Sequence, residues 1–139
     1  MLQRTLILFK PDALRKGICG KVLSRFEGAG CTIRGCKMLQ LPKKILREHY
    51  AHIAALPFYG EVETFMQSSP VIAMVLEGEG VIDRVREMLG VTDSRKAAPG
   101  TIRSEFGVNQ MVNVCHASDS EETAGIEIRR FFREEEIFE

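Results

Sequence analysis

Two uninterrupted apolar segments, TLILF at 5–9 and PVIAMVL at 70–76, constrain the fold of this chain more than any other feature. A strand that is apolar at every position must be covered on both faces, so we expect both segments at the centre of a sheet. Two further segments, TIRGCKMLQL at 32–41 and VNVC at 112–115, are half polar and suit the edges of the same sheet. The sequence therefore predicts four strands with helices over both faces.

Helical patterns separate these strands. Apolar residues recur at helical spacing in segments that begin at 18, 42 and 81, and a shorter helix is expected around 62–66. After the last strand, Ser118-x-x-Glu121 predicts a capping box and a helix that begins near Asp119. The order strand–helix–strand, twice over, is the split βαβ pattern. We predict an α+β fold: a ferredoxin-like split βαβ sandwich whose four-stranded antiparallel sheet carries helices on its faces, in one domain over 1–139.

The charge balance and the cysteines exclude several classes of protein. The chain carries 19 basic and 19 acidic residues, so it has no global positive field for nucleic acid. The first apolar run is too short for a signal peptide or a membrane span. No C-x-x-C pair is present, and we expect four buried, reduced thiols in a cytoplasmic protein. These are Cys19, Cys31, Cys36 and Cys115.

The segment from Gly90 to Val112 is rich in glycine, proline and small residues. We expect a long loop without regular structure, and loops of that length usually have a function. The segment leads into NVCHASDS at 113–120, which holds a single histidine.

His116 is expected at the end of the last strand, one turn before a helix N-terminus. The partial positive charge of that terminus favours a neutral, nucleophilic imidazole and any anion nearby. Glu127 falls at the margin of the buried face of the helix, where it can accept the ring N–H of His116 and fix its tautomer. A solvated helix carboxylate is the alternative for Glu127.

Three cations stand out among the charged residues: Lys10 at the end of the first central strand, Arg86 on the flank of a helix, and Arg103 in the long loop. Each alone suits a solvated surface, but together they suit a polyphosphate. The known phosphate-loop fingerprints are absent. We interpret His49 and His52 as surface or packing residues rather than metal ligands, and Cys115 as an inert buried thiol.

Six motifs in this order resemble those of nucleoside diphosphate kinases. They are RTLILFKPDALRKG (4–17), EHYAH through PFYG (48–60), PVIAMVLEG (70–78), RVREMLGVTD (84–93), AAPGTIRSEFG (97–107) and NVCHASDS (113–120). The resemblance covers nearly the whole chain, and N-x-x-H-x-S-D together with K-P-D and P-G-T-I-R is highly specific. It implies a single nucleoside diphosphate kinase-like domain.

The resemblance also implies a ping-pong reaction. A nucleoside triphosphate would phosphorylate His116, and a nucleoside diphosphate would then remove the phosphoryl group. Lys10 would contact the phosphoryl group and the sugar hydroxyl, and Tyr50 would hydrogen-bond near the phosphoryl group. Glu127 and Ser118 would support His116.

By the same resemblance, five residues besides Lys10 would bind the nucleotide. Phe58 would stack on the base, Asn113 would bind the sugar 3′-hydroxyl, and Arg86, Thr92 and Arg103 would bind the phosphates. Mg²⁺ would be held mainly by the nucleotide phosphates, since the chain offers no carboxylate cage. The family implies a homotetramer or homohexamer, and the chain, whose last residues are EEEIFE, resembles the shorter bacterial-type members.

The chain departs from the family pattern at Ala117, where glycine is usual, and at Leu76, where tryptophan is common. We predict a negative φ at Ala117 and a packing role for Leu76. Two alternatives stay open: a catalytically degenerate nucleotide-binding regulatory protein on the same fold, and a nucleic-acid-binding module. The missing RNP1 aromatic pattern and the zero net charge argue against nucleic acid as the main partner.

Overall fold

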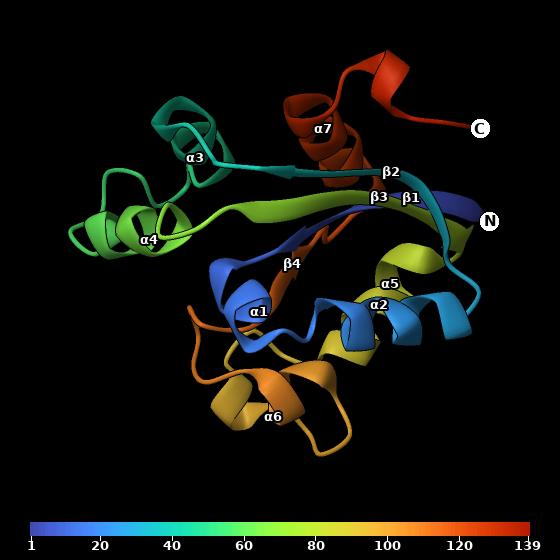
Figure 1. Cartoon of the computed structure of the whole chain (residues 1–139), viewed down its shortest axis with the longest axis horizontal. Coiled ribbons are helices and arrows are strands. Elements are labelled where there is room, and N and C mark those ends of the chain that lie inside the picture. The colour runs from blue at the N-terminus through green and yellow to red at the C-terminus, as the bar shows by residue number, and fades with distance from the viewer.

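The computed structural model, which describes residues 1–139, has one four-stranded antiparallel sheet in the order β2-β3-β1-β4 (Figure 1). The strands are β1 (Leu2–Phe9), β2 (Thr32–Leu39), β3 (Val71–Glu79) and β4 (Cys115–Ala117). The two apolar segments form the central strands, paired from Leu2 opposite Glu79 to Phe9 opposite Ile72. The predicted α+β architecture, with the half-polar strands at the edges, is confirmed.

Helices cover both faces of this sheet. They are α1 (Pro11–Lys16), α2 (Cys19–Gly28), α3 (Lys43–His49), α4 (Tyr59–Met66), α5 (Val81–Leu89), α6 (Ile102–Phe106) and α7 (Glu121–Phe131), with 3₁₀ turns at Ser94–Lys96 and Glu134–Glu136. In Figure 1, α1, α2, α5 and α6 lie on one side of the sheet, and α3 and α7 lie on the other.

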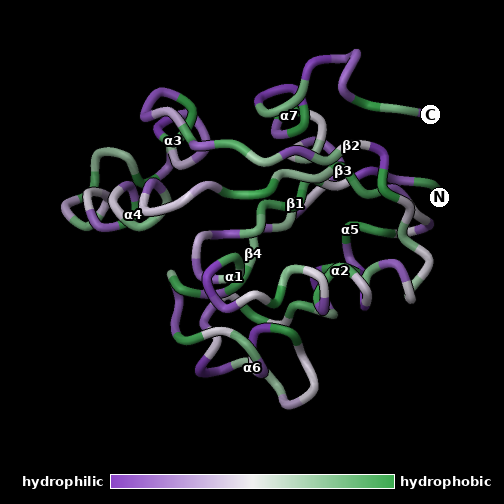
Figure 2. Tube along the Cα trace, in the orientation of Figure 1, coloured by the Kyte–Doolittle hydropathy of each residue, from purple (hydrophilic) through white to green (hydrophobic).

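Side-chain alternation divides the core between these two layers. Ile7 and Phe9 of β1 pack into the cluster with α2 and α5, whereas Leu6 and Leu8 pack into the cluster with α3, α4 and α7. Both sets are buried, and Figure 2 shows hydrophobic residues along the central strands. An apolar residue at every position is therefore what a strand covered on both faces requires.

Several element boundaries differ from the sequence prediction. Pro11 opens a helix, α1, as a proline in the first turn does, besides ending the strand before it. Helix α3 ends at His49, although the helical spacing of apolar residues that begins at 42 continues to Ile53. The segment 90–112 is not without regular structure, because it contains a 3₁₀ turn and α6, whose cap Thr101 accepts a hydrogen bond from Ser104 N.

The predicted capping box at the start of α7 is wrong. Ser120, not Ser118, is the cap, and its Oγ accepts the backbone N–H of Thr123 at 3.1 Å. Ser118 is buried and its hydroxyl has other partners, so it is unavailable to the helix. The predicted burial of all four thiols is also wrong, because Cys36 is exposed on edge strand β2 and Cys19 is half-buried. All four cysteines are free. No helix has the length and apolar character needed to cross a bilayer.

Candidate active site

A cavity of about 1210 Å³ opens beside β4, between α3, α7 and the segment 90–113. All of the predicted site residues except Ser118 line it. Ser118 lies behind the cavity wall, fully buried. The fold thus brings together residues that are far apart in the sequence, and their individual roles stay predictions.

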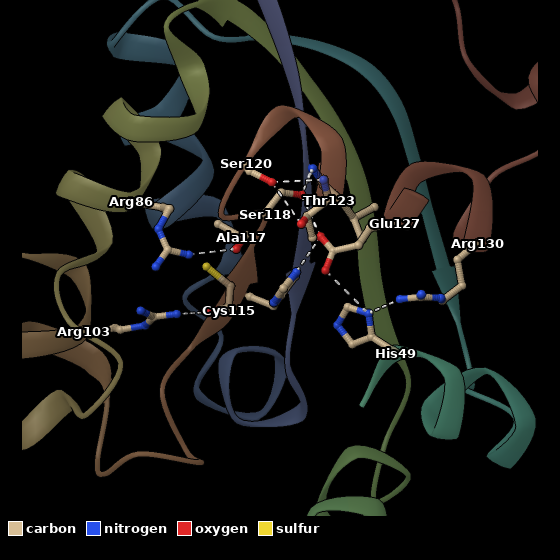
Figure 3. Close-up of polar contacts among 12 residues, drawn as sticks. His49, Arg86, Arg103, Cys115, Ala117, Ser118, Ser120, Thr123, Glu127 and Arg130 are labelled. Carbon is tan, nitrogen blue, oxygen red and sulfur yellow. Dashed lines mark hydrogen bonds and ion pairs between the residues drawn. The ribbon is translucent and has the colours of Figure 1, made fainter. Parts of the chain in front are cut away.

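His116 lies within β4, opposite Leu8 of the central strand, and is 25 % exposed to the cavity. Its Nε2 is 2.9 Å from Oε1 of Glu127, which α7 holds in a buried position (Figure 3). An ionised carboxylate can only accept, so Nε2 carries the ring proton and Nδ1 keeps a free lone pair. The solvated alternative for Glu127 is therefore excluded.

A short chain of hydrogen bonds anchors this carboxylate to the central strand. The Ser118 hydroxyl donates to Glu127 Oε1 at 2.7 Å, and the backbone N–H of Leu6 donates to Ser118 Oγ at 3.0 Å. Strand β1 thereby fixes Glu127, which in turn fixes the tautomer and orientation of the His116 ring.

His49 belongs to this cluster, although we expected only a surface or packing residue. Its ring lies at 4.6 Å from the His116 ring in an edge-to-face arrangement, and Arg130 Nη1 is 3.0 Å from its Nδ1. A guanidinium can only donate, so Nδ1 accepts and the ring is neutral. Burial first, and then the neighbouring His116 and Arg130, hold the pKa of His49 well below its usual value.

His49, His116 and Glu127 each offer one ligand atom within 4.8 Å of the others, which is the spacing of a possible metal site. These groups already have hydrogen-bond partners: Glu127 Oε1 accepts from Ser118 and His116, and His49 accepts from Arg130. The guanidinium beside His49 also disfavours a further cation. The arrangement suits a network that orients His116 better than it suits a resident metal.

Lys10 contributes the most buried positive charge in the cavity. Its Nζ donates to Asn113 Oδ1 at 2.8 Å and to the Met111 carbonyl at 3.2 Å. Burial, followed by the nearby Arg103 guanidinium, lowers the pKa of Lys10 to about 8. Lys10 is thus a cation near neutral pH. Its two hydrogen-bond partners are uncharged oxygens, so its charge can attract an incoming anion.

The two arginines are held differently. Arg103 is buried and donates to three backbone carbonyls, those of Asn113 (3.2 Å), Gly90 (3.0 Å) and Cys115 (2.7 Å). Burial lowers the pKa of Arg103 from its ordinary value. Arg86 reaches only the carbonyl of Ala117, at 3.4 Å, and keeps most of its donors free.

The remaining predicted residues surround the cavity. Asn113 donates to the carbonyls of Thr92 and Gln110 at 3.0 and 3.1 Å, which orients its amide. Thr92 is exposed, and Phe58 presents a ring that is 49 % exposed. Tyr50 is half-buried, and burial raises the pKa of its hydroxyl.

Two expectations about neighbouring residues are confirmed. Cys115 is fully buried, and this burial raises the pKa of its thiol to about 12, which makes it inert. Ala117 does not have a positive φ, since Val114 is the only non-glycine residue that does. The methyl group at 117 therefore fits without backbone strain.

Known proteins are similar to this chain in fold and in sequence along its whole length. The sequence profile described as "Nucleoside diphosphate kinase" matches residues 3–137. A nucleoside diphosphate kinase of Staphylothermus marinus is 46% identical over 99% of this chain and 97% of its own length. One of Bacillus cereus is 44% identical over 98% of this chain and 92% of its own.

Solved structures agree. The nucleoside diphosphate kinase of Aquifex aeolicus superposes with a TM-score of 0.92 at 46% identity, covering 99% of both chains. That of Halobacterium salinarum, in complex with CDP, superposes with a TM-score of 0.96 at 35% identity, covering 100% of this chain and 93% of its own. The chain therefore belongs to the nucleoside diphosphate kinase family and is an enzyme that transfers a phosphoryl group between nucleotides.

Proposed function

We propose that this chain transfers the terminal phosphoryl group of a nucleoside triphosphate to a nucleoside diphosphate in two steps, through a phosphohistidine at His116. The bond between His116 Nε2 and Glu127 carries the proposal, because it leaves Nδ1 as a free nucleophile facing a cationic cavity. In the first step Nδ1 attacks the γ-phosphorus, the bond to the β,γ-bridging oxygen breaks, and the diphosphate leaves. In the second step a terminal oxygen of another diphosphate attacks, and the P–N bond breaks.

Four further residues serve this chemistry. Glu127, backed by Ser118, stabilises the positive charge that develops on the imidazole as Nδ1 bonds to phosphorus. Lys10 supplies an ammonium for the transferring phosphoryl oxygens. Tyr50 supplies a hydroxyl that stays protonated, because burial raises its pKa, and can therefore donate to the same group.

The nucleotide lies with its base at the mouth of the cavity and its phosphates toward His116. Phe58 offers a ring face on which any base can stack. Asn113 meets the sugar hydroxyl, and Arg86, Thr92 and Arg103 meet the phosphates. The Halobacterium relative is described in complex with CDP, which supports a nucleotide in the corresponding cavity.

Mg²⁺ fits this site as a companion of the nucleotide. The only cluster of three potential ligands in the chain is His49, His116 and Glu127, so no carboxylate cage is present. When bound, the ion would be held mainly by the nucleotide phosphates and would spread their negative charge. Lys10, Arg86 and Arg103 would bind phosphate oxygens beside it.

The chain acts as a homo-oligomer, a tetramer or hexamer, of single-domain subunits in the cytoplasm. Edge strand β2 supports the assembly, because it pairs only with β3 and exposes Ile33 and Met38. Two cores packed on one sheet support the single domain. Four free cysteines support a reducing compartment.

Transfer of a label tests the reaction. The protein is incubated with γ-labelled ATP and Mg²⁺, separated from nucleotide, and then given a diphosphate. We expect labelled protein that passes its label on, with a bond lost in acid and kept in alkali, as for a phosphoramidate. His116→Ala should bind nucleotide and take no label. Acid-stable label would assign the reaction to a hydroxyl instead, and binding without any label in the wild type would favour the degenerate regulatory protein.

A further inference from the structure

Val114 has a backbone conformation that its side chain disfavours. Its φ is 79°, and no other non-glycine residue of the chain has a positive φ. A β-branched residue in this region is a genuine outlier, which persists only where the surroundings impose it. Val114 is fully buried and lies directly after Asn113 and two residues before His116. The strain therefore lies inside the segment that carries two of the proposed site residues.

Two groups from the end of β1 and the start of α1 hold the strained residue. The backbone N–H of Val114 donates to Asp12 Oδ2 at 3.0 Å, and its carbonyl accepts from the backbone N–H of Lys10 at 3.0 Å. Both polar groups of the residue are thus fixed from outside its own segment.

Arg103 holds the residues on either side. It donates to the carbonyl of Asn113 at 3.2 Å and to that of Cys115 at 2.7 Å, so one guanidinium holds the residues before and after Val114. Figure 3 shows Arg103 beside Cys115. Asp12 and Arg103 form a clamp on Val114 from two helices, α1 and α6.

Asp12 is the member of this clamp that the phosphoryl-transfer chemistry does not use. It is buried, it does not line the cavity, and its second oxygen, Oδ1, has no hydrogen-bond partner. A buried carboxylate with one oxygen unpaired is unfavourable for folding alone. What Asp12 provides is a strong, charge-assisted bond to the N–H of Val114.

We propose that Asp12 is a positioning residue: by holding Val114 in its strained conformation, it fixes Asn113 against Lys10 and sets the start of β4 so that His116 faces the transferring phosphoryl group. This inference rests on the proposed role of His116. The hydrogen bond between Lys10 and Asn113 depends on the conformation of Val114, because the side chain of Asn113 is attached to the backbone one residue before it.

The first test removes the acceptor. In Asp12→Ala the N–H of Val114 loses its partner and the strained conformation of Val114 relaxes. We therefore expect kcat to fall at least about tenfold. The affinity for ADP should fall by a smaller factor than kcat, because Phe58 and Arg86 lie outside the segment that Asp12 holds, although Asn113 lies within it. Asp12→Asn keeps an oxygen that can accept the same N–H, and its kcat should stay within about threefold of the wild type. If Asp12→Ala does not fold, Asp12→Ser, whose side chain is too short for this bond, replaces it.

The second test asks whether Asp12 acts through the backbone of Val114. Glycine adopts positive φ freely, so Val114→Gly needs no clamp, whereas Val114→Ala also loses the side chain but keeps the strain. Adding Asp12→Ala to the Val114→Gly variant should lower kcat by less than about threefold. Adding it to the Val114→Ala variant should lower kcat by at least about tenfold.

Equal losses in the two backgrounds, or wild-type kcat in Asp12→Ala, would overturn the inference. Folding of each variant is checked by circular dichroism at the assay temperature, and kcat is expressed per folded protein. Label transfer by the wild type, measured in parallel, separates the two proposals. An unlabelled wild type contradicts the phosphohistidine, whereas a labelled wild type with an unaffected Asp12→Ala contradicts only the role of Asp12.

Discussion

The ammonium group of Lys10 is buried against Asn113, and this position makes phosphate binding depend on pH. With a pKa of about 8 in the free protein, Lys10 loses its charge as the pH rises through that value. We expect kcat/KM for ATP to be flat with respect to this group below pH ~8 and to fall by up to about tenfold per pH unit above it. In Lys10→Gln, activity should be low and this alkaline limb should be absent.

The contribution of Lys10 to folding stability should rise with pH where kcat/KM falls, and this difference separates loss of the Lys10 charge from unfolding. The unfolded chain keeps the Lys10 proton up to the ordinary pKa of 10.5, whereas the folded protein releases it at about 8. Between these values the unfolded state binds more protons, so the contribution of this group to stability rises with pH. An alkaline limb that persists in Lys10→Gln, or that follows loss of secondary structure, would contradict the assignment to Lys10.

Ala117 is the departure from the family pattern nearest to the proposed nucleophile. It lacks a positive φ, so its methyl group adds no backbone strain. We expect Ala117→Gly to change kcat by less than about tenfold, or ~1.4 kcal/mol. A larger gain in steady-state rate would mean that the methyl group obstructs the phosphoryl group, and would favour the degenerate regulatory protein.

At the scale of elements, a hydrogen bond between two side chains contributes to the contact between α3 and α7. Arg130 of α7 donates to the buried His49 of α3 at 3.0 Å. Arg130→Met leaves His49 Nδ1 without its donor, so we expect the free energy of unfolding to fall by ~1–3 kcal/mol. Urea denaturation measures this change.

Arg129→Met is the matched control, because Arg129 is the exposed neighbour of Arg130 on the same helix and has no hydrogen bond or ion pair within the protein. We expect its unfolding free energy to stay within ~0.5 kcal/mol of the wild type. Equal losses in the two variants would show that helix composition, rather than the bond to His49, accounts for the effect.

The sequence predicted those elements whose signals are local. The central strands follow from uninterrupted apolar runs, and α5 follows from its amphipathic spacing. The last strand was predicted at 112–115, whereas β4 is Cys115–Ala117. The prediction was wrong because valine is typical of strands, but the φ of 79° at Val114 interrupts the extended backbone. The pairing with β1 therefore begins only at Cys115, opposite Phe9.

The residues of the candidate site differ in the same respect: some carry a signal in the local sequence and others do not. The motif residues were found because their spacing is specific, and the cavity brings them together. His49 was not recognised as part of the site, because its partners, Arg130 and His116, lie far along the chain. The backbone bonds of Arg103 were also beyond prediction, since a sequence does not tell which carbonyls a guanidinium will meet.

For the molecule as a whole, the proposed homo-oligomer can be tested at the edge strand β2. Met38 is 62 % exposed on this unpaired edge, and Met38→Asp places a charge there, which opposes strand pairing. We expect the variant to shift toward smaller species in light scattering after size exclusion. Leu2→Asp, on the central strand β1, is the control and should keep the wild-type mass. An unchanged mass in Met38→Asp would place the interface elsewhere.

The pairing of β4 with β1 also determines when the protein becomes active during folding. His116 lies opposite Leu8, and its partner Glu127 is tied to Leu6 through Ser118. The nucleophile is thus completed by contacts between the two ends of the chain, which close late because long loops form slowly. During refolding, recovery of phosphotransfer should lag behind helix formation. On the ribosome, a nascent chain should stay inactive until α7 has emerged, however much of the sheet is already in place.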